Sequence, residues 1–235
     1  MVKQHKFERF EKLIGSSNLK TLSKKSVLIL GCGGVGGYAC EALARSNIGT
    51  LILVDYDVVD ITNINRQVIA LNSTIGRKKV DALEERINDI NSNCKVIKID
   101  KFIDSNNLDI LFQNKIDFFV DACDTISTKK EILKKCLDKK IDFISSMGTG
   151  NKLDPSKLEI VDIRKTINDP LARILRRFIK DEKINKKIMV LSSRELPMKT
   201  KDRIPGSTAF VPSSAGLLIA SYVVRWLLNN KEKKD

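Results

Sequence analysis

The sequence predicts an α/β fold: a Rossmann-like, mostly parallel sheet flanked by helices, with antiparallel strands added in the C-terminal half. Two observations support this fold. The apolar segment Val27–Leu30 leads through the glycine-rich turn Gly31–Gly36 into a helical segment, and a second apolar segment, Leu51–Val54, ends at Asp55. Further apolar segments then alternate with amphipathic ones at the spacing of strand–helix–strand units, as right-handed crossovers between parallel strands require.

The individual elements follow in order along the chain. The expected strands are short and rich in Val, Ile, Leu or Phe, as buried parallel strands are: Ser26–Leu30, Leu51–Asp55, Lys95–Ile99, Ile116–Asp121 and Asp142–Ser146, followed by Leu158–Ile163 and Ile188–Leu191 as candidate antiparallel strands. The expected helices have apolar residues at helical spacing: Val35–Ser46, Lys78–Asn91, Thr128–Asp138 and the basic, amphipathic Pro170–Lys180.

The longest apolar stretch, Ala209–Leu228, lies near the C-terminus. Pro212, two serines and Arg225 interrupt it, whereas a transmembrane helix needs about 20 predominantly apolar residues. We therefore expect no membrane association, but a helix buried against the sheet and capped by Ser213 or Ser214.

The length of 235 residues fits one domain with a substantial core. We expect an N-terminal arm at 1–25 and a nucleotide-binding core at 26–150. The remainder, 151–235, would supply substrate-side strands, a mobile loop at about 195–206 and the C-terminal helix.

The formal charge of +13 favours an anionic partner, for which a large RNA is a candidate. Solvated lysine-rich helix faces and the lysine-rich tail explain the same charge without any partner. Candidate RNA contacts, each equally well explained as a solvated basic face, are Arg164, Lys165, Arg173, Arg176, Arg177, Lys199, Lys201 and Arg203.

The cysteine and histidine content limits the chemistry. No two of the five cysteines form a C-x-x-C pair, so we expect no zinc. Their odd number, with no signal peptide, fits a reducing cytoplasm. The single histidine, His5, argues against histidine-based acid–base catalysis and excludes a multi-histidine metal site.

The glycine-rich turn predicts a nucleotide site. Gly31 allows a tight turn, Gly33 and Gly34 let the main chain approach a phosphate, and Gly36 lets the helix pack close to the strand. The free N–H groups of the helix then face the anion. Asp55, 24 residues after Gly31, is placed to accept hydrogen bonds from ribose hydroxyls.

The residues after Asp55 favour a triphosphate over a dinucleotide. The segment continues to Asn63 and Arg66, which can offer an amide and a forked guanidinium to phosphate oxygens. Lys79 adds a mobile positive charge, although a solvated helix face shared with Lys78 explains it equally well. Asp57 is either a supporting residue of the site or the cap of a turn. After the next strand, Asp124 can hold Mg²⁺, which takes one or two carboxylates plus phosphate oxygens.

These motifs resemble one family across nearly the whole chain. The matching segments are Phe7–Gly15, Gly31–Gly36, Glu41–Ser46, Asp55–Gln67, Asp121–Thr125, Ser145–Pro155, Asp169–Arg173 and Ile204–Pro212. The chain resembles the adenylating family that includes the ubiquitin-activating enzymes, MoeB and ThiF. The last three segments are typical of its branch that dehydrates threonylcarbamoyladenosine in tRNA.

The resemblance implies that ATP activates a carboxylate as an acyl-adenylate, with Mg²⁺. The threonyl carboxylate of the modified tRNA nucleoside would be adenylated, and its own carbamoyl group would close a ring as AMP leaves. The resemblance also implies a homodimer, in which Arg9 reaches the partner's γ-phosphate site, and it leaves open a sulfur-relay protein and a monovalent cation. Cys123 lies beside Asp124, but a packing role is expected for it.

Three alternatives predict different partners. A ubiquitin-like sulfur carrier with a Gly-Gly end would replace the tRNA in a related adenylating enzyme, which usually has a zinc site. An NAD-dependent oxidoreductase would not need Asn63, Arg66 and Asp124. A non-catalytic RNA-binding protein would not need the full set of charged site residues.

Overall fold

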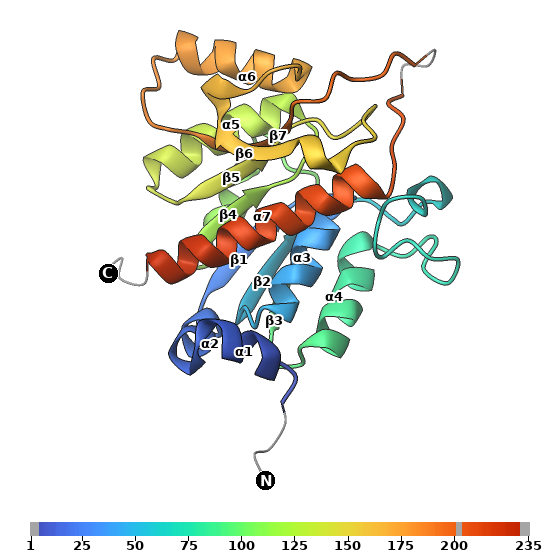
Figure 1. The fold of residues 1–235 in the computed structure, drawn as a ribbon, viewed down its shortest axis with the longest axis vertical. Helices are drawn as coiled ribbons and strands as arrows, with labels where there is room; N and C mark the ends of the chain where they lie inside the picture. Colours follow the sequence, from blue (N-terminus) through green and yellow to red (C-terminus); the bar gives the residue numbers. More distant parts are fainter. Residues whose placement is uncertain (1–4, 201–203, 231–235) are drawn as a thin grey trace.

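A seven-stranded sheet forms the centre of the computed structural model, which describes residues 5–200 and 204–230 (Figure 1). The strands are β1 (Ser26–Leu30), β2 (Thr50–Val54), β3 (Lys95–Ile99), β4 (Phe118–Asp121), β5 (Phe143–Ser146), β6 (Leu158–Asp162) and β7 (Met189–Ser193). Their order across the sheet is β3-β2-β1-β4-β5-β7-β6, and neighbouring strands are parallel except for the pair β6 and β7. The predicted fold class is confirmed, including the antiparallel addition in the C-terminal half.

The helices agree with the expected positions, with one exception at the N-terminus. They are α1 (Glu8–Ile14), α2 (Ser16–Leu22), α3 (Gly36–Arg45), α4 (Lys79–Ile90), α5 (Ile126–Asp138), α6 (Pro170–Asp181) and α7 (Phe210–Asn229). The sequence predicted an arm where α1 and α2 lie. Helix α1 has no fully buried residue, although Phe10 and Ile14 pack partly buried against the core, and α2 buries only Leu19 and Leu22.

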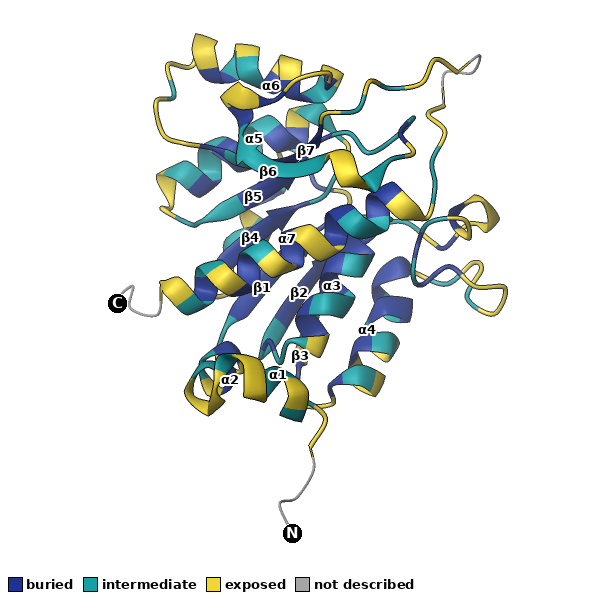
Figure 2. Cartoon of the chain, in the orientation of Figure 1, coloured by how far each residue is buried: buried dark blue, intermediate teal, exposed yellow. Residues whose placement is uncertain are grey.

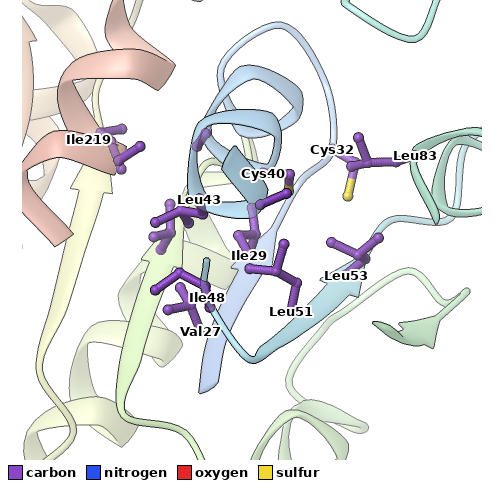
Figure 3. Close-up of a cluster of buried hydrophobic side chains, with 14 of the residues drawn as sticks. Val27, Ile29, Cys32, Cys40, Leu43, Ile48, Leu51, Leu53, Leu83 and Ile219 are labelled. Atoms are coloured by element: carbon purple, nitrogen blue, oxygen red, sulfur yellow. The ribbon is translucent and has the colours of Figure 1, made fainter. Parts of the chain in front are cut away.

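The core occupies both faces of the sheet because successive residues of a strand point to opposite sides. In β1, Val27 and Ile29 face α3, α4 and α7, and Leu28 and Leu30 face α5 and the 3₁₀ turn Leu108–Phe112. Figure 3 shows the first of these clusters, in which Ile219 of α7 belongs to the same core as the β1 side chains. A strand buried on both faces explains why its sequence is continuously apolar.

Helix α7 is the apolar segment whose burial the sequence predicted. By length and composition alone it could cross a membrane, and half of that apolar window is buried inside the protein. The helix lies diagonally over α3 and the sheet (Figure 1). At the crossing point, a Cβ on Gly216 would stand 2.3 Å from the carbonyl oxygen of Val35, so only glycine permits this approach.

The predicted cap of this helix is wrong. The helix begins at Phe210, and Ser213 lies inside its first turn, where its hydroxyl donates to the carbonyl of Phe210 at 3.1 Å. The capping acceptor is instead Thr208, whose Oγ1 accepts hydrogen bonds from the N–H groups of Phe210 and Val211. Pro212 does not interrupt the helix because a first-turn residue has no intrahelical partner for its N–H.

The close approach at Gly216 gives a stability prediction. The added methyl group of Gly216→Ala must push α7 away from α3, and we expect the free energy of unfolding to fall by about 1–3 kcal/mol. Urea denaturation measures this loss. Ser221→Ala, an exposed substitution in the same helix, is the control and should change stability by less than about 0.5 kcal/mol. Equal stability of the two variants would contradict the packing described for Gly216.

Candidate nucleotide-binding site

A pocket lies at the carboxyl ends of β1, β2 and β4. In the sheet order, the chain proceeds outward from β1 to β2 and β3 in one direction and to β4 and β5 in the other. Ligands of open α/β sheets bind at such a switch point. The cavity measures about 360 Å³. Of the residues predicted for the site, the pocket brings together Gly31, Gly33, Gly34, Asp55, Asp57, Asn63, Arg66, Lys79 and Asp124.

Gly36 shapes the pocket without lining it. A Cβ at this position would stand 1.8 Å from the carbonyl oxygen of Gly31, so the first turn of α3 presses directly on the end of β1. At Gly33 the glycine loop is open, since a Cβ there would meet nothing closer than 3.7 Å. The helix therefore directs its first N–H groups into an accessible space, the arrangement that binds phosphate.

Asp55 is fixed in place by backbone amides. Its Oδ2 accepts a hydrogen bond from the N–H of Cys32 at 2.6 Å and its Oδ1 accepts one from the N–H of Asp57 at 2.9 Å. Burial raises the pKa of the Asp55 carboxyl, while the positive charge of Lys79 and these two amides oppose the rise. The carboxyl group links the glycine loop to the end of β2 and presents its remaining lone pairs to the pocket.

The structure distinguishes the two neighbouring lysines. Lys79 is 5% exposed and its Nζ lies 2.6 Å from Asp57 Oδ2 inside the pocket. Lys78 instead forms an ion pair with Asp100 on the surface. The solvated-face alternative therefore applies to Lys78 and not to Lys79.

Asn63 and Arg66 belong to one compact turn. Asn63 ends the 3₁₀ turn Ile61–Asn63, and its Oδ1 accepts a hydrogen bond from the N–H of Asp60, which completes a reciprocal cap. The Asn63 amide N–H groups remain as donors at the pocket wall. Arg66 Nη1 donates to the carbonyl of Thr62 at 2.8 Å, and no carboxylate among the described residues pairs with this guanidinium.

Asp124 is exposed at the pocket rim, above a buried ionic network. In this network Asp121 Oδ2 accepts from Lys129 Nζ at 2.9 Å and from Ser145 Oγ at 2.6 Å. Lys129 and Asp121 are each 1% exposed. Because Asp121 also accepts from the N–H of Cys123, the network fixes the short segment that ends in Asp124.

Several residues of the pocket were not predicted. Tyr56 and Phe102 form an edge-to-face pair, with ring centroids 5.0 Å apart, and both line the pocket next to Lys101. Lys101 and Phe102 lie just beyond the end of β3, after Asp100, and the end of a parallel strand was the one signal that could have identified them. Gln67, 7% exposed, is a further lining residue, and its Oε1 is without a hydrogen-bond partner among the described residues.

Cys123 does not have the environment of a nucleophile. Its Sγ donates to Asp121 Oδ1 at 3.1 Å, and burial together with the Asp121 charge raises the pKa of the thiol well above its usual range. A reactive cysteine needs the opposite, a positive environment that favours the thiolate. The described part of the chain holds no cluster of three or more histidine, cysteine, aspartate or glutamate side chains suited to a metal ion.

Arg9 does not reach the pocket of its own chain. It is an exposed residue of α1, which precedes α2 and the amino end of β1, whereas the pocket lies at the carboxyl end of that strand (Figure 1). Lys201 and Arg203, two of the candidate RNA contacts, lie outside the described residues.

Comparisons with known proteins agree with this geometry. The model of the ThiF family matches residues 7–235. The tRNA threonylcarbamoyladenosine dehydratase of Bacillus subtilis is 43% identical, over 98% of this chain and 97% of that protein. The enzyme of the same name from Escherichia coli is 35% identical, over 76% of this chain and 67% of that protein. The structure of the E. coli enzyme, TcdA, in complex with ATP superposes with a TM-score of 0.91 at 29% identity, covering 98% of this chain and 96% of that one.

Proposed function

The chain belongs to the ThiF family, and we propose that it is an ATP-dependent tRNA threonylcarbamoyladenosine dehydratase. The observation that carries the proposal is the agreement of two independent findings. A relative that covers the chain almost end to end is a dehydratase of this kind. The pocket also combines a glycine loop, a ribose-type acid and three cations, Arg66, Lys79 and Lys101. We take the whole chain, including the arm at its N-terminus, as one adenylating unit.

The reaction activates a carboxylate. One oxygen of the threonyl carboxylate attacks the α-phosphorus of ATP, and pyrophosphate leaves. An atom of the carbamoyl group of the same nucleoside then attacks the acyl carbon and closes a ring, and AMP leaves with the former carboxylate oxygen. The nucleoside has lost one water in total. Because the nucleophile and the electrophile are in one molecule, the second step has a high effective molarity and needs no cysteine.

The pocket residues have separate roles in this proposal. Asp55 binds the ribose hydroxyls, and the glycine loop donates its N–H groups to phosphate. Arg66 and Lys79 hold phosphate oxygens and stabilise the charge that develops at phosphorus. Asn63 supplies amide donors beside them. Asp57 positions the Lys79 ammonium, as the distance of 2.6 Å between their polar atoms indicates.

The charge of the pocket points to further cations. Three carboxylates, Asp55, Asp57 and Asp124, line it beside its three cations, so one chain alone offers a triphosphate no excess positive charge. Asp124 fits Mg²⁺, because it is exposed at the rim and, among the described residues, forms no ion pair. When bound, Mg²⁺ would neutralise phosphate charge there. Besides Mg²⁺, we propose Arg9 of another subunit as a further positive charge at the pocket.

A two-fold dimer would deliver that arginine. The exposed face of α7 carries Phe210, Leu217 and Leu218, which are 60%, 50% and 38% exposed, and Leu13 of α1 is 80% exposed (Figure 2). One end of α7 borders the pocket through Pro212, and α7 also packs against α2, the neighbour of α1. If two such helices pair antiparallel about a two-fold axis, each α1 lies at the partner's pocket.

Subunit complementation tests this arrangement. Arg9→Ala and Asp124→Ala each remove one component of a pocket, and we expect each homodimer to be inactive. In a mixed population half of the dimers are heterodimers, each with one intact pocket, so co-expression should restore about a quarter of the wild-type activity. No recovery in verified heterodimers would show that Arg9 acts within its own chain or not at all.

Cys123→Ser tests the absence of covalent catalysis. Because the thiol is protonated and bonded to Asp121, a serine hydroxyl can replace it, and we expect kcat and KM to stay within about threefold of the wild type. Steady-state assays on the modified tRNA measure this. A folded variant without activity would indicate a covalent role for Cys123.

AMP release tests the proposed function. We expect AMP to accumulate from ATP only when tRNA carrying threonylcarbamoyladenosine is present. A ubiquitin-like carrier ending in Gly-Gly should not replace the tRNA, and AMP formation driven by such a carrier would favour the related function instead. The names of the relatives that cover most of this chain favour the tRNA. We propose that the enzyme acts in the cytoplasm, as its odd number of cysteines, with no C-x-x-C pair, suggests. A sulfur-relay partner and a monovalent cation remain expectations from the resemblance alone.

A further inference from the structure

One region outside the pocket carries a large share of the positive charge of the chain. Residues 164–187 contain nine lysines and arginines against three acids, a net charge of +6 out of +13 in 24 of 235 residues. This region comprises α6 and its flanking turns, and it packs at the β6–β7 end of the sheet (Figure 1). Residues 129–140 carry a net charge of +4 in 12 residues, so charge density alone does not distinguish this region, and the placement of its cations has to.

The three acids do little to neutralise the exposed face. Asp169 is buried and caps α6 through the N–H of Ala172. Glu182 is paired with Lys134 of the neighbouring helix. Only Asp181 faces the basic residues, 3.8 Å from the guanidinium of Arg177, and both of these side chains are largely solvated. An ion pair of this kind contributes little and is readily exchanged.

The structure separates available cations from structural ones. Arg164 donates to the backbone carbonyls of Ile184 and Lys186, and Arg176 donates to the carbonyl of Thr166, so these two residues tie turns together. Arg173, Arg177 and Lys180 are exposed and follow each other at intervals of four and three residues, which places them on one side of α6. With a rise of 1.5 Å per residue, they span about 10 Å along the helix axis.

A groove continues this row of charges. It lies at the carboxyl end of α6, measures about 640 Å³ and is lined by Arg164, Arg176, Lys180 and Lys183, with no carboxylate among its lining residues. We call Arg173, Arg177, Lys180 and Lys183 the α6 basic face. The free carbonyls at the carboxyl end of α6 attract Lys180 and Lys183, so the helix itself explains these two cations. It does not explain Arg173, which lies in the first turn, where the helix macrodipole favours an acid.

The α6 basic face starts at the rim of the nucleotide pocket. Asp169, the cap of α6, accepts a hydrogen bond from the N–H of Gly148 at 3.0 Å, and the next residue, Thr149, lines the pocket. The buried Lys152 reinforces this junction, because its Nζ donates to the carbonyl of Gly148 at 2.7 Å and lies 3.6 Å from Asp169. A polymer with one unit in the pocket can therefore continue directly along α6.

We propose that the α6 basic face binds the phosphate backbone of the tRNA next to the nucleoside held in the pocket. This inference rests on the proposed function for the identity of the RNA. The row supplies positive charges about 4.5–6 Å apart along the helix axis. This is wider than the one phosphate per about 3.4 Å of strand, but the side chains are long and the arginines can fork onto phosphate oxygens. Because the α6 basic face contacts phosphates and no bases, it contributes to the affinity for the tRNA and to its position on the enzyme, and not to sequence specificity.

The test is the salt dependence of tRNA binding. The variant R173Q/R177Q/K180Q removes three charges at exposed positions, and its thermal unfolding verifies that the fold is intact. Fluorescence anisotropy then gives Kd for labelled tRNA between about 50 and 200 mM salt. We expect Kd to rise at least about tenfold at the lower salt, and the slope of log Kd against log salt to fall by about 2–3. The KM for ATP should not change.

A matched variant controls for net charge. K24Q/K95Q/K115Q removes three exposed lysines at the amino ends of β1, β3 and β4, the end of these strands opposite to the pocket. We expect it to change Kd by less than about threefold. If both variants weaken binding equally, or if neither does, the α6 basic face is not the docking surface.

A second readout separates this inference from the proposed function. With saturating tRNA, the α6 variant should dehydrate the nucleoside at the wild-type kcat, because none of its changed residues lines the pocket. If the wild type binds tRNA through α6 but dehydrates nothing, the docking surface stands and the proposed function fails. If the wild type dehydrates and the α6 variant binds tRNA normally, only the docking surface fails. If the α6 variant loses binding to an acidic protein as strongly as it loses binding to tRNA, the surface serves protein partners instead.

Discussion

Replacing Asp124 by alanine is expected to abolish adenylate formation in a protein that remains folded. The carboxylate is exposed at the rim and contributes no ion pair to the described structure, so the fold does not depend on it. The reaction does, because two anions must meet at phosphorus and the pocket of one chain has no net positive charge. We expect AMP release to fall by roughly 10²–10³-fold or more, the range for loss of one preorganised electrostatic group.

Two further substitutions make this prediction specific. Asp124→Asn keeps the shape of the side chain, and we expect it to raise the Mg²⁺ concentration required for half-maximal activity. Asp138→Ala removes an exposed carboxylate at the end of α5 and should leave activity unchanged. A folded Asp124→Ala enzyme with wild-type activity would show that the metal is held elsewhere.

Lys129→Met is expected to destabilise the fold more than Gly216→Ala does. The ammonium group of Lys129 is buried and bonded to Asp121 at 2.9 Å and to Ser145 at 3.1 Å. Removing it leaves the Asp121 carboxylate uncompensated in the core, a change that costs about 3–5 kcal/mol. Urea unfolding measures the loss. The segment from Asp121 to Asp124 should loosen as well, so ATP affinity is expected to fall.

A double variant separates charge from packing in this network. Asp121→Asn removes the buried negative charge. Its amide oxygen can still accept from the Cys123 N–H at the Oδ1 position, and its NH2 group, at the Oδ2 position, can donate to the Ser145 hydroxyl. Combined with Lys129→Met, it should recover much of the lost stability, because no charge remains unpaired. If the double variant is as unstable as the sum of the single ones, packing of the Lys129 chain is the larger effect.

The sheet could be predicted from the sequence because each strand of its centre is buried on both faces. Such strands are continuously apolar, and every predicted strand overlaps an observed one within two residues. Helices α1 and α2 were not predicted. No residue of α1 is fully buried, and its contact with the core is limited to the partly buried Phe10 and Ile14. The cap of α7 was misplaced by one turn, because Pro212 resembles a helix boundary when its position within the first turn is unknown.

The pocket residues also fall into two groups, those that the sequence alone brings together and those that the strand order brings together. The glycine loop, Asp55 and Arg66 lie in one continuous motif, so their spacing alone brings them together. Lys101 and Phe102 come from the end of β3, and their approach to Tyr56 depends on the strand order, which the sequence does not state. The same holds for Arg9, whose proposed target lies in another subunit.

The most direct test of the central claim is the mass of the modified nucleoside. Purified tRNA carrying threonylcarbamoyladenosine would be incubated with the protein, Mg²⁺ and ATP, digested gently to nucleosides and analysed by mass spectrometry. The account predicts that the nucleoside loses one water, and that the loss requires both ATP and Asp124. An unchanged mass, in an assay where a known dehydratase converts the same tRNA, would contradict it.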